Sequence, residues 1–130
     1  MANPNIVNVA TIVGGNAAWA LTNTITTTLL TVAADVIVKI NSIICTNIHG
    51  TNAAALSLEI KGMGSGATGV TVANPLATCR LASTINVPAD DILVVIDKPI
   101  YLMENDILRG GASAASVLEL FASFEVINDA

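Results

Sequence analysis

Apolar and polar residues alternate with a period of two along most of this chain, and this pattern constrains the fold more than any other feature. In "AALSLEIKG", Ala54, Leu56, Leu58 and Ile60 share one face and the residues between them share the other. Successive side chains of a strand point to opposite sides, so this alternation predicts a half-buried β-strand. The segment "SVLELFASFEVI" near the end of the chain alternates in the same way. We therefore expect a chain built from strands.

Two of the expected strands are neighbours in sequence, over about residues 35–48 and 53–62. In the first, the even-numbered residues from Val36 to Ile48 share one face. The sequence "HGTN" between the two segments is typical of a turn. We therefore predict that the two strands form a hairpin.

Further strands are expected in "LATCRLASTINVP", "DILVVID" and "PIYL", with Lys98-Pro99 marking an edge or a break. The threonine-rich N-terminal third also favours strands over helices. About eight short strands, separated by turn signals every 8–14 residues or so, predict an all-β fold. A single antiparallel β-sandwich, jelly-roll-like, is our first choice, and a small barrel is the alternative.

The glycine-rich stretch "GMGSGATG", from Gly62 to Gly69, is expected to be a loop. A phosphate-binding GxGxxG segment needs a strand before it and a helix after it. Here the strand-like "VTVANP" follows. The sequence therefore gives no support for a nucleotide site, and we expect no cofactor.

The composition is unusually poor in charge for a chain of one-domain length. Of 130 residues, 53% are hydrophobic and 12% are charged, whereas soluble domains have about 25% charged residues. A membrane protein is one explanation, but the best apolar stretch, "ADVIVKINSIIC", is interrupted by polar residues and is too short to span a bilayer. We prefer an obligate oligomer that covers apolar surface with partners. The N-terminus "MANPNIVNVA" has no signal-peptide features.

Charge and aromatic content argue against nucleic-acid binding. The net charge is −5, and the five Lys and Arg residues are scattered singly, without a basic stripe. Only four aromatic residues are present, which is few for stacking on single-stranded nucleic acid.

Cys45 and Cys79 lie in strand-like apolar segments and are interpreted as small buried hydrophobes, and whether they pair stays open. His49 has no partner nearby for a zinc site.

Two acidic segments are candidates for chemistry. "PIYLMENDILRGGASAAS" holds Glu104 and Asp106, and we interpret it as a solvated turn in which Arg109 is available to pair with one carboxylate. In this interpretation Gly110-Gly111 breaks the apolar run before the last strand. "PADD", Pro88 to Asp91, is interpreted as a β-turn, with calcium bridging between subunits as the alternative. With no G-x-S-x-G motif and one histidine, we expect no enzyme.

A set of phrases in fixed order carries a family resemblance: "VNVATI", "ALTNTITTTLL", "VKINSIICTNIHGTNAAALSLEI" and "LASTINVPADDILVVIDKPIYLMENDILRGGASAASVLELFASFEVI". With these, the chain resembles small virion structural proteins of tailed bacteriophages, notably those infecting cyanobacteria and other aquatic bacteria. The resemblance covers most of residues 20–127. Two features depart from the family pattern: Asn105 stands where glycine is expected, and the "GMGSGATG" loop is extra.

The resemblance implies a β-rich component of the virion that repeats one contact many times. The favoured role is a capsid decoration (cement) protein, expected as a trimer, that clamps neighbouring major capsid subunits. The alternative is a head–tail connector or tail component in a ring of about six or twelve copies. From another class, a carbohydrate-binding β-sandwich stays open, with Trp19 and Tyr101 as its only candidate aromatic platforms.

A decoration protein of this kind needs a segment that reaches its neighbours. Residues 1–14 are predicted to be an N-terminal arm or edge strand that adds to a neighbour's sheet, and residues 15–130 to be the sandwich domain. Whether the threonine-rich run Thr22–Thr31 faces solvent or an interface stays open. The residues predicted for the interface are Ile6, Val7, Val9, Ile12, Trp19, Leu29 and Leu30.

Overall fold

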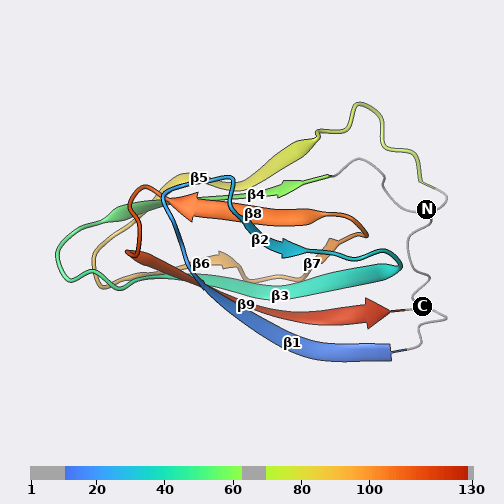
Figure 1. Ribbon diagram of the computed structural model, residues 1–130, viewed down its shortest axis with the longest axis horizontal. Helices are drawn as coiled ribbons and strands as arrows, with labels where there is room; N and C mark the ends of the chain where they lie inside the picture. The colour runs from blue at the N-terminus through green and yellow to red at the C-terminus, as the bar shows by residue number, and fades with distance from the viewer. Residues whose placement is uncertain (1–10, 63–69, 129–130) are drawn as a thin grey trace.

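The computed structural model describes residues 11–62 and 70–128, and within these ranges the chain forms nine β-strands and no helix (Figure 1). The all-β prediction is confirmed. In this part of the chain no helix could cross a membrane. The strands are β1 (Thr11–Ala20), β2 (Thr28–Thr31), β3 (Val36–Asn47), β4 (Ala54–Lys61), β5 (Thr78–Val87), β6 (Ile92–Ile96), β7 (Ile100–Leu102), β8 (Ile107–Ala112) and β9 (Leu118–Asn128).

The strands form two antiparallel sheets that face each other (Figure 1). Sheet A has the order β1-β9-β3-β6, with β7 also paired to β3, and sheet B has the order β2-β8-β4-β5. The pairs are nested along the chain: β4 with β5, β3 with β6 and β7, β2 with β8, and β1 with β9. If β6 and β7 are counted as one interrupted strand, this nesting is the jelly-roll arrangement, and the predicted jelly-roll-like sandwich is confirmed.

The predicted hairpin over residues 35–48 and 53–62 is wrong. β3 belongs to sheet A and β4 to sheet B, so the turn between them carries the chain across the sandwich. Buried Asn47 holds this crossing, because its side-chain amide donates to the carbonyls of Asn52 (3.0 Å) and Val87 (2.9 Å). Its side-chain oxygen accepts from the His49 N–H at 2.8 Å. The "HGTN" turn is present, but it joins strands that do not pair.

A second correction concerns the buried face of β3. The register against β9 shifts between Ile40 and Ser42. Because one extra residue reverses the alternation, the buried face changes from the even-numbered residues to the odd-numbered ones. The predicted face is therefore correct up to Ile40 and wrong beyond it. The side chains of β3 that face sheet B are Val36, Val38 and Ile40 before the shift, and Ile43, Cys45 and Asn47 after it; Ile37 is also buried, on the opposite face.

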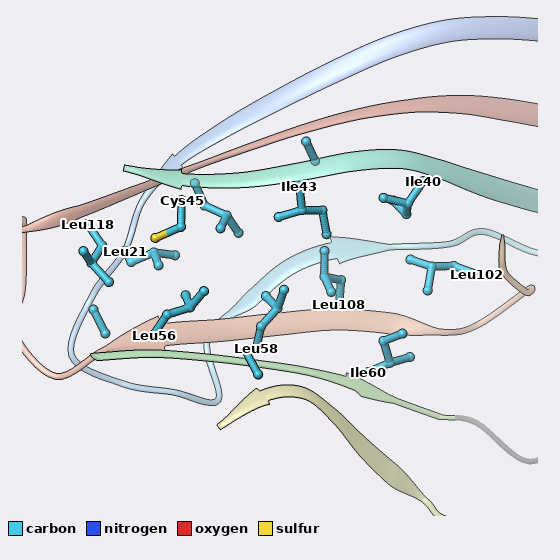
Figure 2. Packing of buried hydrophobic residues seen from close by; sticks show 14 of the residues in the cluster. Leu21, Ile40, Ile43, Cys45, Leu56, Leu58, Ile60, Leu102, Leu108 and Leu118 are labelled. Atoms are coloured by element: carbon cyan, nitrogen blue, oxygen red, sulfur yellow. The ribbon is translucent and has the colours of Figure 1, made fainter. Parts of the chain in front are cut away.

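The core lies between the sheets and consists of branched aliphatic side chains from both (Figure 2). The face predicted for β4, from Ala54 to Ile60 in steps of two, is buried as expected. Leu118, Leu120 and Ala122 of β9 are also buried, which confirms the alternation near the end of the chain. In Figure 2, Cys45, Ile43 and Ile40 of β3 point toward Leu56, Leu58 and Leu108 of the opposite sheet.

Gly110 and Gly111 do not break a strand, contrary to the expectation; they lie inside β8 and are buried. The loop before β2 packs directly on them. The Gly110 N–H donates to the Thr27 carbonyl (3.0 Å), and the Ala112 N–H donates to the Thr22 carbonyl (2.8 Å). The first part of the threonine-rich run therefore contacts β8 through its backbone, although most of its side chains are exposed.

Candidate interaction surface

The free edge of β1 is the most regular open edge of the sandwich. β1 pairs with β9 over ten residues without a shift in register, from Thr11↔Asn128 to Ala20↔Glu119. Along its other edge, no strand of the described residues pairs with it. The strand carries no charged side chain, and the first charged residue of the whole chain is Asp35. An uncharged, uninterrupted edge of this length is a template for pairing with another strand.

The other three sheet edges carry features that hinder pairing. β2 has four residues and a register shift against β8. β5 has two register shifts against β4, an exposed Arg80, and Thr84 in the left-handed region with φ 50°. β6 and β7 are separated by Asp97-Lys98-Pro99, as the sequence predicted. Short edges, bulges, charges and proline are the features that natural sheets use against edge-to-edge association.

Next to this edge, the outer face of sheet A, which is turned away from sheet B, exposes a row of apolar side chains. Cross-strand pairing places Ala18 beside Phe121, Phe121 beside Ile44, and Ile44 beside Val94. Phe121 and Val94 are exposed. The row therefore runs from the β1 edge across β9 and β3 to β6.

A shallow hollow of about 420 Å³ lies at the β1 end of this row. Small side chains form much of its lining, because Ala18, Ala20 and Thr46 stand where larger residues would fill the space. Its lining residues are Ala18, Trp19, Ala20, Thr46, Glu119, Leu120 and Phe121. The hollow is thus apolar with one carboxylate, and it belongs to the same surface as the free edge.

Of the seven residues predicted for the interface, the structure describes four: one is exposed and three are partly buried. Ile12 is exposed on β1, with 59% of its surface accessible. Trp19 of β1 and Leu29 and Leu30 of β2 are partly buried and pack against the core. Ile6, Val7 and Val9 lie outside the described residues, as does most of the predicted arm 1–14, whose last four residues begin β1.

Sequence reasoning missed Val13, Ala18 and Phe121 of this surface. The uncharged stretch that precedes Asp35 was the available signal for the open edge. Phe121 was visible as an apolar residue between Glu119 and Ser123 on the outward face of the last strand.

The interpretation of Glu104 and Asp106 as a solvated turn is wrong, because both side chains are buried, with 6% and 4% of their surface accessible. A Glu104 carboxylate oxygen accepts from the Asp35 N–H at 3.0 Å, and Asp106 Oδ2 accepts from the Met103 N–H at 2.9 Å. The expected pairing of Arg109 with one of them is also wrong. Arg109 instead contacts Glu59 of β4 at 3.1 Å. The Glu104 and Asp106 carboxylates thus hold the β7–β8 turn in place, whereas the Arg109–Glu59 pair links β8 to β4.

Burial also perturbs the titration of Asp106. Its Oδ1 is buried without a hydrogen-bond partner. Burial raises the pKa of Asp106 above its ordinary value of 3.8, and the hydrogen bond from Met103 opposes this in part. The folded protein therefore binds a proton at this site more readily than the unfolded chain does. The stability that Asp106 contributes is fully present below pH 3.8 and is lost as pH rises through the raised pKa.

We expect Asp106→Asn, which removes this titration with little change of shape, to gain stability relative to the wild type as pH increases. The measurement is the free energy of unfolding in urea from pH 3 to pH 7 for both proteins. Asp97→Asn, which removes an exposed carboxylate, is the matched control for the change in net charge. A difference between Asp106→Asn and wild type that stays constant over this range would contradict the assignment.

The remaining candidate residues, His49, the "PADD" segment and the two cysteines, lie in turns and strands without a grouping that suggests chemistry. His49 Nδ1 accepts from the Thr51 and Asn52 N–H groups at 3.1 and 3.0 Å, which closes the turn between β3 and β4. "PADD" is a β-turn as predicted, with the Asp91 N–H donating to the Pro88 carbonyl. Both cysteines are free, and burial raises the pKa of the Cys45 thiol to about 11. In the described ranges, no three His, Cys, Asp or Glu side chains group as metal ligands.

The free β1 edge and the adjoining apolar face are thus the best candidate for a functional surface, and their chemistry suits protein association. Comparison with models of protein families, with curated proteins and with solved structures finds no match for this chain.

Proposed function

We propose that this chain is a non-enzymatic structural protein that works by repeated association, and that it belongs to the virion of a tailed bacteriophage as a capsid decoration protein. The observation that carries the proposal is the unprotected edge of β1 beside an exposed apolar face. Proteins that stay monomeric normally hinder such edges. The low charge content of 12% is in keeping with surface that partners cover.

The virion assignment itself comes from the resemblance of residues 20–127 to small phage structural proteins. The jelly-roll fold is compatible with it, since this fold is frequent in viral capsid proteins, but it also occurs in lectins and cupins. A fold alone does not decide between these functions. The order of strand and turn phrases in the sequence therefore supports the phage assignment, and the open edge supports the mode of action.

The mechanism we propose is passive clamping. A decoration protein that binds neighbouring capsid subunits only in their mature arrangement stabilises that arrangement by mass action. No covalent step is needed. The exposed apolar face of sheet A offers contact area to such a neighbour, and the open edge of β1 offers backbone hydrogen bonds to one further strand.

Carbohydrate binding is less well supported than assembly. The two aromatic residues considered for it, Trp19 and Tyr101, lie on β1 and β7, which β9 and β3 separate in sheet A. They cannot form one platform. The hollow that Trp19 lines with Glu119 and Phe121 is where a sugar would bind in this alternative.

We expect this chain in purified phage particles at on the order of one copy per major capsid subunit, because decoration proteins follow the capsid lattice. Quantitative mass spectrometry of particles, with the major capsid protein as the internal standard, measures this ratio. A total of about six or twelve copies would instead assign the chain to a head–tail connector or tail ring. Absence from particles would overturn the virion proposal.

A further inference from the structure

We infer that the β1 strands of two copies pair antiparallel about a two-fold axis, so that sheet A continues from one molecule into the other. This contact goes beyond the proposed function, because it concerns the isolated chain and does not depend on any capsid. It also differs from the trimer or ring expected from the resemblance.

The first step is that β1 is suited to pairing. Ten residues present backbone groups along an edge to which no other described strand is paired. Register shifts, a charge or a proline interrupt the edges at β2, β5 and β6–β7. Since the same molecule hinders three edges and leaves one open, the open edge is the one available for a neighbouring strand.

The second step is that an identical strand fits this edge. The molecule carries a net charge of −5, yet residues 11–20 contain none of the charged side chains. Two copies can therefore approach along β1 without placing like charges side by side. A basic partner strand would find no carboxylate on β1 to pair with, so charge gives no preference for a different protein.

The third step is that the two halves of β1 complement each other. The beginning, Thr11–Val13, is bulky, and Ile12 and Val13 are 59% and 57% exposed. The end, Ala17–Ala20, is small except for Trp19. An antiparallel pair brings the bulky half of each strand against the small half of the other. A parallel pair would place the two bulky halves together.

Paired residues must share a face of the sheet, so the two-fold axis passes through a residue of β1, and we place it at Asn16, near the middle of the strand. This axis places Ile12 opposite the partner's Ala20, and Val13 opposite the partner's Trp19. The side chain of Val13 then covers the indole, which is only partly buried in the single molecule. Asn16 is exposed on the outer face and meets its own copy at the axis.

Face-to-face packing of two copies through the outer face of sheet A is the competing arrangement. That face carries Glu119, Glu125 and Lys39 around its apolar row. Covering it would take these charges out of water, and burial of incompletely paired charges is costly. Pairing along the β1 edge leaves the exposed apolar side chains of this face, Phe121 and Val94, in solvent and available to another protein.

The test compares one substitution on two edges. Asn16→Asp places two carboxylates next to each other at the two-fold axis. Asn86→Asp makes the same change on the exposed edge strand β5 and is the matched control. Sedimentation velocity of the full-length chain over a concentration series measures self-association. We expect a wild-type dimer, an unchanged dimer for Asn86→Asp, and about tenfold or more weakening for Asn16→Asp at low salt. Added salt should restore part of the loss.

Three results would overturn the inference. A wild-type chain that stays monomeric at hundreds of micromolar would mean that another protein's strand occupies the edge. A trimer would exclude a two-fold contact as the main one. Equal effects of Asn16→Asp and Asn86→Asp would place the contact elsewhere. Because copy number in particles is a separate measurement, the dimer and the virion proposal can each fail alone.

Discussion

Replacing Gly111 by alanine is expected to lower the free energy of unfolding by about 3 kcal/mol or more. A Cβ atom at Gly111 would lie 2.5 Å from the Thr24 carbonyl oxygen and 2.9 Å from the Thr22 carbonyl oxygen. Both are backbone atoms, so neither can rotate away as a side chain would. The loop before β2 would have to move, which weakens the hydrogen bond from the Ala112 N–H to the Thr22 carbonyl.

Gly14→Ala is the matched control, because Gly14 also lies in a strand but has nothing within 4 Å of an added Cβ. Alanine there restricts the unfolded chain and should be neutral or stabilising, by up to about 1 kcal/mol. Urea unfolding at one fixed protein concentration, followed by the fluorescence of Trp19, compares the variants. If both substitutions changed stability equally, the loop would not be held as tightly as its packing on β8 indicates.

The local part of this fold could be predicted from sequence, because alternation is a local property. The buried faces of β4 and of the first half of β9 follow directly from it. Strand pairing could not be predicted in the same way. A turn at His49–Asn52 is compatible both with a hairpin and with a crossing between sheets. Which one forms depends on β5, β8 and β9, the strands that β3 and β4 pair with instead of each other.

The shift in β3 had a weak signal in the sequence. Asn41 and Ser42 are consecutive polar residues inside an otherwise apolar alternation, and such a pair marks a place where the alternation can change phase. The sequence does not determine whether the alternation changes phase at this pair. The register of β9 opposite this point decides it, and that strand lies about eighty residues away.

The acidic segment shows where composition misleads. Glu-Asn-Asp is typical of an exposed turn, yet Glu104 is held by a backbone N–H of Asp35, which is distant in sequence. The candidate surface was predictable in one respect, since Ile12 was chosen from an N-terminal segment expected to be an arm or edge strand. That β1 lies at the edge of its sheet is a property of the topology, and alternation does not reveal it.

Replacing Arg109 by methionine is expected to lower the free energy of unfolding by about 3 kcal/mol. Glu59 and Arg109 lie opposite each other on β4 and β8, with the guanidinium 3.1 Å from the carboxylate. The Glu59 side chain is only 7% exposed, so removing Arg109 leaves a buried carboxylate without its partner. Because 19% of the Arg109 side chain is accessible, some water can reach the site, and the loss should lie at the low end for such pairs.

Two further variants separate the lost pairing from lost packing. Arg80 lies opposite Glu59 on the other neighbouring strand, β5, and is exposed, so Arg80→Met should cost at most about 1 kcal/mol. The double variant Glu59→Gln/Arg109→Met removes both charges and should regain most of the stability lost in Arg109→Met, because the penalty comes from the unpaired carboxylate. Urea unfolding at neutral pH of the wild type, Arg80→Met, Arg109→Met, Glu59→Gln and the double variant measures the coupling. A double variant as unstable as the sum of its single changes would mean that the arginine stabilises this sheet through its aliphatic stem and not through its charge.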